Sequence, residues 1–140
     1  MWFSKKEGAA QPALQTTTKS RGDAAEAVAL AHLQQAGLQL LHRNYRTPGR
    51  GGGEIDLIMC DRDGTLVFIE VRQRASASQG GAGASISGVK QKRIIFAAKH
   101  YLMRLNTPPP CRFDVVLVQG ALGPSGAASL EWLHSAFDAG

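Results

Sequence analysis

The sequence predicts a single α/β domain, in which helices pack on a mixed β-sheet. Two apolar runs, 53–60 and 65–74, lie on either side of an Asp-Gly turn, which is typical of a β-hairpin. Helical periodicity of apolar residues appears before this hairpin, over 21–36, and again after it, over 88–105. The resulting order of elements is helix, strand, strand, strand, helix, strand, which indicates a mixed sheet covered by helices.

The composition fits one domain with an ordinary core, since 44% of the 140 residues are hydrophobic. Residues 1–19 are polar and without period, so we expect a tail without fixed structure, followed by a domain over 20–140. A net charge of +5 favours polyanionic partners, although part of that charge lies in the tail. The sequence leaves the oligomeric state open, a homodimer included.

The cellular location is expected to be the cytoplasm. Cys60 and Cys111 have the spacing of neither a zinc site nor a disulfide framework, so both are predicted to be reduced core residues. No apolar run reaches the length of a membrane span, and the first residues lack the apolar centre of a signal peptide. We therefore expect no membrane partner.

The first helix is predicted over 21–36, with Ser20 as its N-cap and Gly37 as its stop. Glu26 falls on the same stripe as Leu30 and Leu33, so the acidic residue in the helix body points the way the leucines point. It is either a boundary glutamate at the edge of the core or a third carboxylate delivered to the hairpin.

A strand over 38–46 is expected next, followed by the glycine-rich loop 47–53. This loop is not a Walker A loop, because no Gly-Lys-Ser/Thr follows it. Such a loop is either a mere connection or a place where a phosphate backbone can come close. It carries Arg50, and Arg46 precedes it.

The hairpin turn determines which residues face one another. In a three-residue loop with Gly64 left-handed, Asp61 pairs with Thr65 and Asp56 lies directly opposite Glu70. In a two-residue turn, Asp56 would instead oppose Ile69. Alternation along the first strand predicts that Ile55, Leu57 and Met59 share the face opposite Asp56.

Asp56 and Glu70 each stand among apolar residues, where unpaired charge is rarely buried. Directly opposed Cβ atoms lie about 4.5–5.5 Å apart, so the two carboxylates repel unless a cation lies between them. A hard divalent cation with oxygen ligands satisfies both, and we expect Mg²⁺ or Mn²⁺. In the structural alternative, Asp56 forms an ordinary ion pair with Arg72 or Arg74.

The rest of the chain adds a basic helix and two further elements. Loops are expected over 75–87 and 120–129, a strand over 111–118 and a short terminal element over 130–137. In the helix predicted over 88–105, Lys90, Arg93 and Arg104 flank one side of the apolar stripe and Lys92 and Lys99 the other. Such a helix is either a solvated face or a phosphate-contacting one.

An Asp, then thirteen residues, then Glu-x-Arg on adjacent strands is similar to the active site of the PD-(D/E)xK nuclease superfamily. The whole of 20–138 resembles the YraN family of bacterial proteins. The segments that carry this resemblance are Gly22–Ala27, Asn44–Arg46, Gly53–Ile58, Val67–Arg72 and Arg112–Val116.

The resemblance implies a restriction-endonuclease-like fold and a metal-dependent endonuclease acting on nucleic acid, with DNA, branched DNA included, as the expected substrate. It makes Asp56 and Glu70 metal ligands, Glu26 a further ligand or one that binds through water, and the main-chain carbonyl of Val71 a completing ligand. Arg72 stands where the superfamily usually has lysine, and arginine cannot act as a base.

Because Arg72 replaces the superfamily's lysine, other cations are considered for the lysine's role and for contacts with nucleic acid. Lys90 is a candidate to replace the missing lysine from another element. Arg46, Arg50, Arg74, Lys90 and Arg93 are the expected nucleic-acid contacts. The rival interpretation is a catalytically inactive nucleic-acid-binding module of the same fold, which the arginine at position 72 favours.

Overall fold

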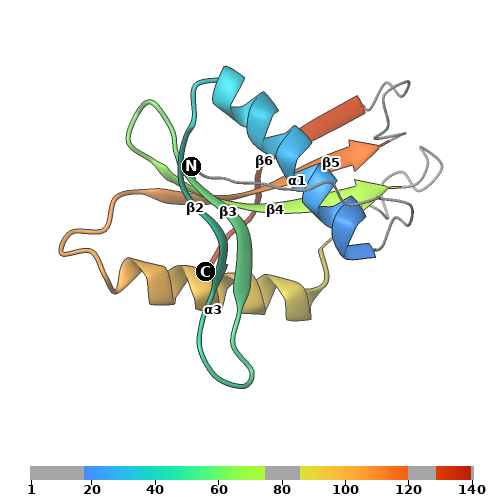
Figure 1. Ribbon diagram of the computed structural model, residues 1–140. Helices are drawn as coiled ribbons and strands as arrows, with labels where there is room; N and C mark the ends of the chain where they lie inside the picture. Colours follow the sequence, from blue (N-terminus) through green and yellow to red (C-terminus); the bar gives the residue numbers. More distant parts are fainter. Residues whose placement is uncertain (1–17, 75–85, 120–128, 140) are drawn as a thin grey trace, which may run out of the picture.

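A computed structural model describes residues 18–74, 86–119 and 129–139, with side chains from residue 23 onward and without that of Arg74. Over these residues a five-stranded sheet of order β2-β3-β4-β5-β6 lies between the helices α1 and α3 (Figure 1). The predicted α/β class is confirmed, and the arrangement is consistent with a restriction-endonuclease-like fold. The elements are α1 (Thr18–Gln35), β2 (Gln39–Arg46), β3 (Glu54–Cys60), β4 (Leu66–Arg74), α3 (Gly88–Leu102), β5 (Cys111–Gln119) and β6 (Ser129–Phe137).

The sheet is mixed. β2, β3 and β4 pair antiparallel, as two successive short connections require. β4 and β5 pair in parallel along their whole length, from Leu66 opposite Cys111 to Arg74 opposite Gln119. A parallel pair needs a crossover connection, and α3 is part of it. β6 closes the edge antiparallel to β5.

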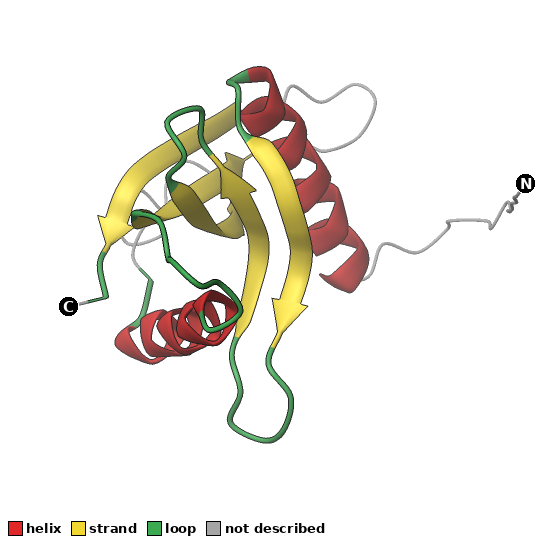
Figure 2. Cartoon of the chain, turned by 90° about the vertical axis from the view of Figure 1, so that its left-hand side faces the viewer, coloured by secondary structure: helices red, strands yellow, loops and turns green. Residues whose placement is uncertain are grey.

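The two helices cover opposite faces of the sheet (Figure 2). Small and apolar side chains of α1 pack on one face, and the middle of α3 packs on the other, so the sheet is apolar on both sides. The α1 side buries Ala25, Ala29, Leu33, Leu57, Met59, Val67, Ile69, Val116 and Val118. The α3 side buries Ile58, Leu66, Phe68, Ile94, Ala97, Ala98 and Phe113.

The helix ends differ in how well the sequence predicts them. α1 begins at Thr18, so Ser20 lies inside the helix and its predicted N-cap role is wrong; capping preference is a local signal that an added helical turn overrides. The predicted stop at Gly37 is confirmed. Gly37 has φ of 106°, and the Leu38 N–H donates to the Leu33 carbonyl at 3.0 Å, which closes a Schellman motif.

The second helix ends at Leu102, three residues before the predicted end at Leu105. The N–H groups of Arg104 and Leu105 donate to carbonyls three residues back, so the chain tightens there instead of continuing the α-helix. Leu105 is exposed, and the apolar stripe therefore stops short of it.

The C-terminal element is a β-strand, β6. Trp132 packs against the α1-side core and Phe137 against the α3-side core, so their predicted docking is confirmed. The predicted tail over 1–19 and the predicted loops over 75–87 and 120–129 lie almost wholly outside the described residues.

Candidate active site

The hairpin register confirms the three-residue loop. The β3–β4 ladder runs from Cys60 opposite Leu66 to Leu57 opposite Ile69. The Asp61 N–H donates to the Thr65 carbonyl at 2.9 Å, and Gly64 is left-handed with φ of 90°. The alternative two-residue turn is excluded, and one step beyond the ladder this register places Asp56 opposite Glu70.

At Asp56 the two strands part. Its Oδ2 accepts a hydrogen bond from the Val71 N–H at 2.8 Å. Beyond the end of the ladder, the Asp56 side chain is thus the acceptor for this backbone N–H. Leu57 and Met59 share a face as predicted, the one that α1 covers, but Ile55 belongs to the α3-side core. The prediction that these three residues share a face is therefore wrong for Ile55, because the regular alternation is lost where β3 leaves β4.

The Asp56 and Glu70 side chains interact across the two strands, since each shifts the pKa of the other. Burial, followed by the charge of Asp56, raises the pKa of Glu70 to about 8, and Glu70 is only 8% exposed. Burial also raises the pKa of Asp56, against the lowering effect of the Val71 N–H. Without a bound cation, the pair therefore favours a state in which Glu70 keeps a proton and Asp56 is ionised.

Lys90 reaches this pair from the first turn of α3. Its Nζ lies 3.6 Å from Glu70 Oε2, and its charge partly counters the rise in the Glu70 pKa. The turn that carries Lys90 is fixed by Ser87, whose hydroxyl accepts from the Lys90 N–H at 3.1 Å as the helix N-cap. Lys90 thus approaches the carboxylates from another element, α3, as the sequence suggested.

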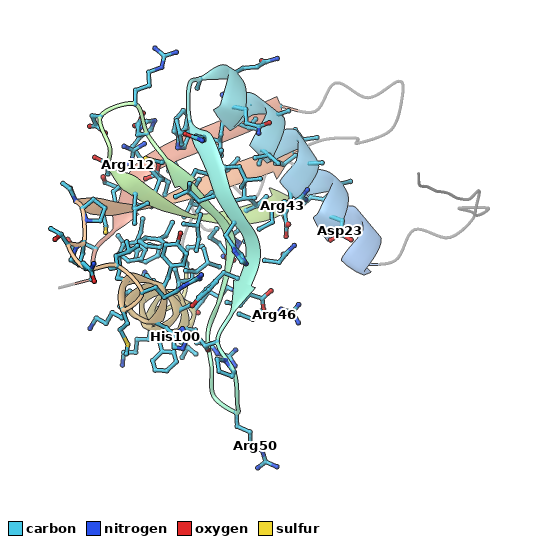
Figure 3. All side chains as sticks on the ribbon, turned by 60° about the vertical axis from the view of Figure 1, so that its left-hand side comes forward. Asp23, Arg43, Arg46, Arg50, His100 and Arg112 are labelled. Atoms are coloured by element: carbon cyan, nitrogen blue, oxygen red, sulfur yellow. The ribbon has the colours of Figure 1, made fainter. Side chains whose placement is uncertain are left out.

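Glu26 lies on the buried side of α1, together with the alanines and leucine of that face. Its Oε1 is 3.7 Å from Arg43 Nη2, and Figure 3 shows Arg43 between β2 and α1. Burial and then the charge of Asp56 raise the pKa of Glu26. Glu26 is therefore close enough to sense Asp56, whereas its role as a further metal ligand stays a prediction.

The residues present fit a divalent cation in one specific respect. Glu70 Oε1 is buried and has no hydrogen-bond partner, so one carboxylate oxygen of the pair lacks a donor. Asp56 supplies a second carboxylate beside it. Within the described ranges, no three His, Cys, Asp or Glu side chains lie close enough to hold a metal ion together. Two carboxylates are thus the protein's side-chain donors there, and main-chain oxygen or water would complete a shell of oxygen ligands.

The predicted nucleic-acid contacts are only partly brought together. Arg46, Lys90 and Arg93 line one cavity of about 200 Å³. Arg50 stands at the tip of the loop after β2, directed away from the helices (Figure 3). Arg74 ends β4, and its side chain is not described. Lys90 lines a second cavity, of about 500 Å³, with Glu70, Val71, Arg72 and Ser87.

The model of uncharacterised protein family UPF0102 matches residues 25–118, which is more than half of the chain. This chain belongs to family UPF0102. The predicted YraN membership is thereby confirmed, since UPF0102 and YraN are the same family.

Full-length relatives carry the same family name. A UPF0102 protein of Polaromonas naphthalenivorans (strain CJ2) is 65% identical over 99% of both chains. Another, from Albidiferax ferrireducens (strain ATCC BAA-621 / DSM 15236 / T118), is 68% identical over 88% of this chain and 91% of its own. These names state a family and no activity, so the function of this UPF0102 protein rests on the chemistry of its site.

A second buried polar cluster of this UPF0102 chain was not predicted from its sequence. Asp114 is fully buried and accepts from Arg112 Nε at 3.1 Å, from Trp132 Nε1 at 2.9 Å and from the Ser135 N–H at 2.9 Å. Arg112 Nη1 also donates to Asp61 at 2.9 Å. The cluster joins β5, β6 and the hairpin turn. Its sequence signal is the Arg-x-Asp spacing, since alternate strand residues share a face.

No helix in the described part of this UPF0102 chain is both long enough and apolar enough to span a membrane.

Proposed function

We propose that this protein is a metal-dependent endonuclease of the cytoplasm that hydrolyses phosphodiester bonds of nucleic acid, DNA in particular, with Mg²⁺ or Mn²⁺ as its cofactor. The observation that carries the proposal is the buried, interacting pair of Asp56 and Glu70 at the point where β3 and β4 part. Membership of UPF0102 gives the family context for the nuclease-like arrangement of these residues.

The pair is costly as a purely structural feature. Burial and mutual repulsion disfavour two ionised carboxylates, and Glu70 Oε1 gains no hydrogen bond in return. A structural role would be served by an apolar pair of similar size. A divalent cation between the two groups instead compensates both charges at once, which supports a metal site.

The cation, when bound, lowers the pKa of a water and stabilises the leaving oxygen in an in-line displacement at phosphorus. The chain's own residues prepare that site. The Val71 N–H holds one oxygen of Asp56 and leaves its other oxygen to the cation, and Glu70 Oε1 has no competing donor. The carbonyl of Val71 would complete the protein's ligands.

Two cations line the cavity on the substrate side of the pair. Arg72 and Lys90 line it together with Glu70, where they stabilise negative charge that develops on the phosphoryl group. Arg72 acts as a fixed cation only, because arginine cannot serve as a base. Lys90, 3.6 Å from Glu70, takes over the part of the superfamily's lysine. Glu26 acts through a water. Burial, followed by the charge of the nearby Asp56, raises the pKa of Glu26.

A second candidate function is an inactive nucleic-acid-binding module. The arginine at position 72 favours it, because the usual lysine of the nuclease motif is missing there. The cavity lined by Arg46, Lys90 and Arg93 serves binding equally well in both cases. The two functions differ in whether the protein binds a metal and cleaves.

A cleavage screen tests the proposal. Purified protein is incubated with duplex, single-stranded and branched DNA in Mg²⁺ or Mn²⁺, next to Asp56→Asn, Glu70→Gln and the control Asp138→Asn. Asp138 is an exposed carboxylate that follows β6 and lines neither of the two cavities. We expect cleavage by the wild type and the control, and none by the two site variants, which still bind DNA. Cleavage that survives both site substitutions would rule the mechanism out.

A further inference from the structure

A basic cavity of about 200 Å³ lies beside the carboxylate pair, between the loop after β2 and helix α3. Three cations face it against one carboxylate, Glu54, which is partly neutralised by Arg46 at 3.6 Å. The remaining lining contains two glycines and a threonine, none of which carries a charge. Its lining residues are Arg46, Thr47, Gly52, Gly53, Glu54, Lys90 and Arg93.

The loop wall of this cavity is closed at its base by hydrogen bonds and lies directly on α3. Thr47 Oγ1 accepts from the Gly53 N–H at 2.7 Å, and the Gly53 carbonyl accepts from the Thr47 N–H at 3.0 Å, which closes the base of the loop. A Cβ at Gly53 would overlap the carbonyl oxygen of Arg93. The loop base therefore lies directly on α3, and this contact sets the position of Arg46 relative to Arg93.

Lys90 connects this cavity with the carboxylate pair. It lines both cavities, while Asp56 and Glu70 do not line the basic one. A nucleic-acid strand whose reacting phosphate lies at Glu70 therefore has a second position, on the far side of Lys90, that suits another backbone phosphate. Arginine at that position offers a fork of donors matched to phosphate oxygens.

We propose that the cavity between Arg46 and Arg93 binds a backbone phosphate of the nucleic acid other than the one that is cleaved. This inference rests on the proposed function, of which it names a second subsite. Arg93 provides the principal contact, and Arg46 and Lys90 complete the charge around the phosphate. The subsite positions the strand and takes no part in the displacement itself.

Arg93 and Lys92 provide a matched pair of variants for the test. Both are exposed cations at adjacent positions of α3, but only Arg93 lines the cavity. Equilibrium binding of a short DNA duplex is measured for full-length protein in EDTA over a range of salt concentrations. We expect Arg93→Ala to weaken binding about tenfold at low salt and to reduce the slope of log K against log salt by about 1. Arg93→Lys should keep the slope, and Lys92→Ala should keep both quantities.

Steady-state cleavage then separates this subsite from the reacting phosphate. Arg93→Ala should raise KM about tenfold while kcat changes far less, because a contact made equally in ground and transition states affects binding alone. An equal loss of affinity in Lys92→Ala, or a fall in kcat at unchanged KM in Arg93→Ala, would overturn the inference. If the wild type binds DNA with the expected Arg93 dependence but does not cleave it, the subsite stands and the nuclease proposal fails.

Discussion

Asp56 and Glu70 are interacting carboxyl side chains of neighbouring strands, at the point where the strands separate. The Val71 N–H anchors Asp56 from one side at 2.8 Å, and Lys90 approaches Glu70 from the other at 3.6 Å. One pair of side chains thus concentrates negative charge that is buried and only partly compensated. This relationship determines the expected pH dependence and metal dependence of the protein.

We expect the free energy of unfolding in EDTA to fall as pH rises from 4.5 to about 8. The folded-state pKa of Glu70 is raised above its ordinary value, so in this pH window the folded protein keeps a proton that the unfolded chain releases. The stabilisation is therefore fully present below pH 4.5 and is lost as the pH rises to about 8. The loss is at most about 5 kcal/mol, at about 1.4 kcal/mol per pKa unit.

Urea unfolding at several pH values measures this loss. Glu70→Gln should flatten the pH dependence, because its amide has no proton to lose, whereas the control Asp138→Asn should retain it. A wild-type stability that stays level or rises across the window would contradict the proposed state of the pair.

Lys90→Met should lower kcat by about 100-fold, since removing one preorganised positive group near the reacting phosphate costs that order of magnitude. Arg72→Lys should retain most of the activity if Lys90 fills the role of the superfamily's lysine. Single-turnover cleavage rates check both, with Lys92→Met as the charge-matched control on the same helix. Wild-type rates in Lys90→Met would show that Lys90 has no catalytic part.

Gly53→Ala should destabilise the fold by about 1–3 kcal/mol, because the new Cβ overlaps the Arg93 carbonyl and forces the loop base away from α3. Gly88→Ala is the matched control, since a Cβ there meets nothing and it lies in the first turn of α3. Thermal or urea unfolding compares the two variants. Equal stability of both would mean that the loop base does not lie on α3 as described.

Asp114→Ala should cost about 3–5 kcal/mol, because it leaves Trp132 Nε1 and the Ser135 N–H without their acceptor and deprives Arg112 of one carboxylate. Asp61→Ala should cost only about 1 kcal/mol, since Asp61 is more exposed and Arg112 keeps Asp114. Urea unfolding ranks the two variants. The reverse order would mean that the cluster does not stabilise the β5–β6 edge.

The sequence predicted the centre of the site because local rules determine it. The Asp-Gly turn fixes the hairpin register, and the register alone brings Asp56 opposite Glu70. Helical periodicity correctly predicted that Glu26 faces the core. Each of these predictions needs only neighbouring residues and one period.

Features that depend on distant parts of the chain were either not predicted from the sequence or were predicted only as candidates. The antiparallel pairing of β5 and β6 brings Asp114 beside Trp132 and Ser135, and no local pattern gives that contact. Ile55 changes sides because β3 leaves β4 to meet α3, a tertiary effect that simple alternation does not contain. For the same reason, the sequence could offer Lys90 as a candidate, but only the packing of α3 brings it to 3.6 Å from Glu70.

Calorimetric titration of Mn²⁺ into the wild type at pH 7 tests the central claim most directly. Because the pKa of Glu70 is about 8 before the cation binds, its carboxyl is mostly protonated, and binding should release close to one proton. Heats measured in buffers of different ionisation enthalpy count that proton. We predict one site with this release in the wild type and in Asp138→Asn, and no binding in Asp56→Asn or Glu70→Gln. Absence of binding in the wild type, or binding that persists in both site variants, would contradict a cation held by Asp56 and Glu70.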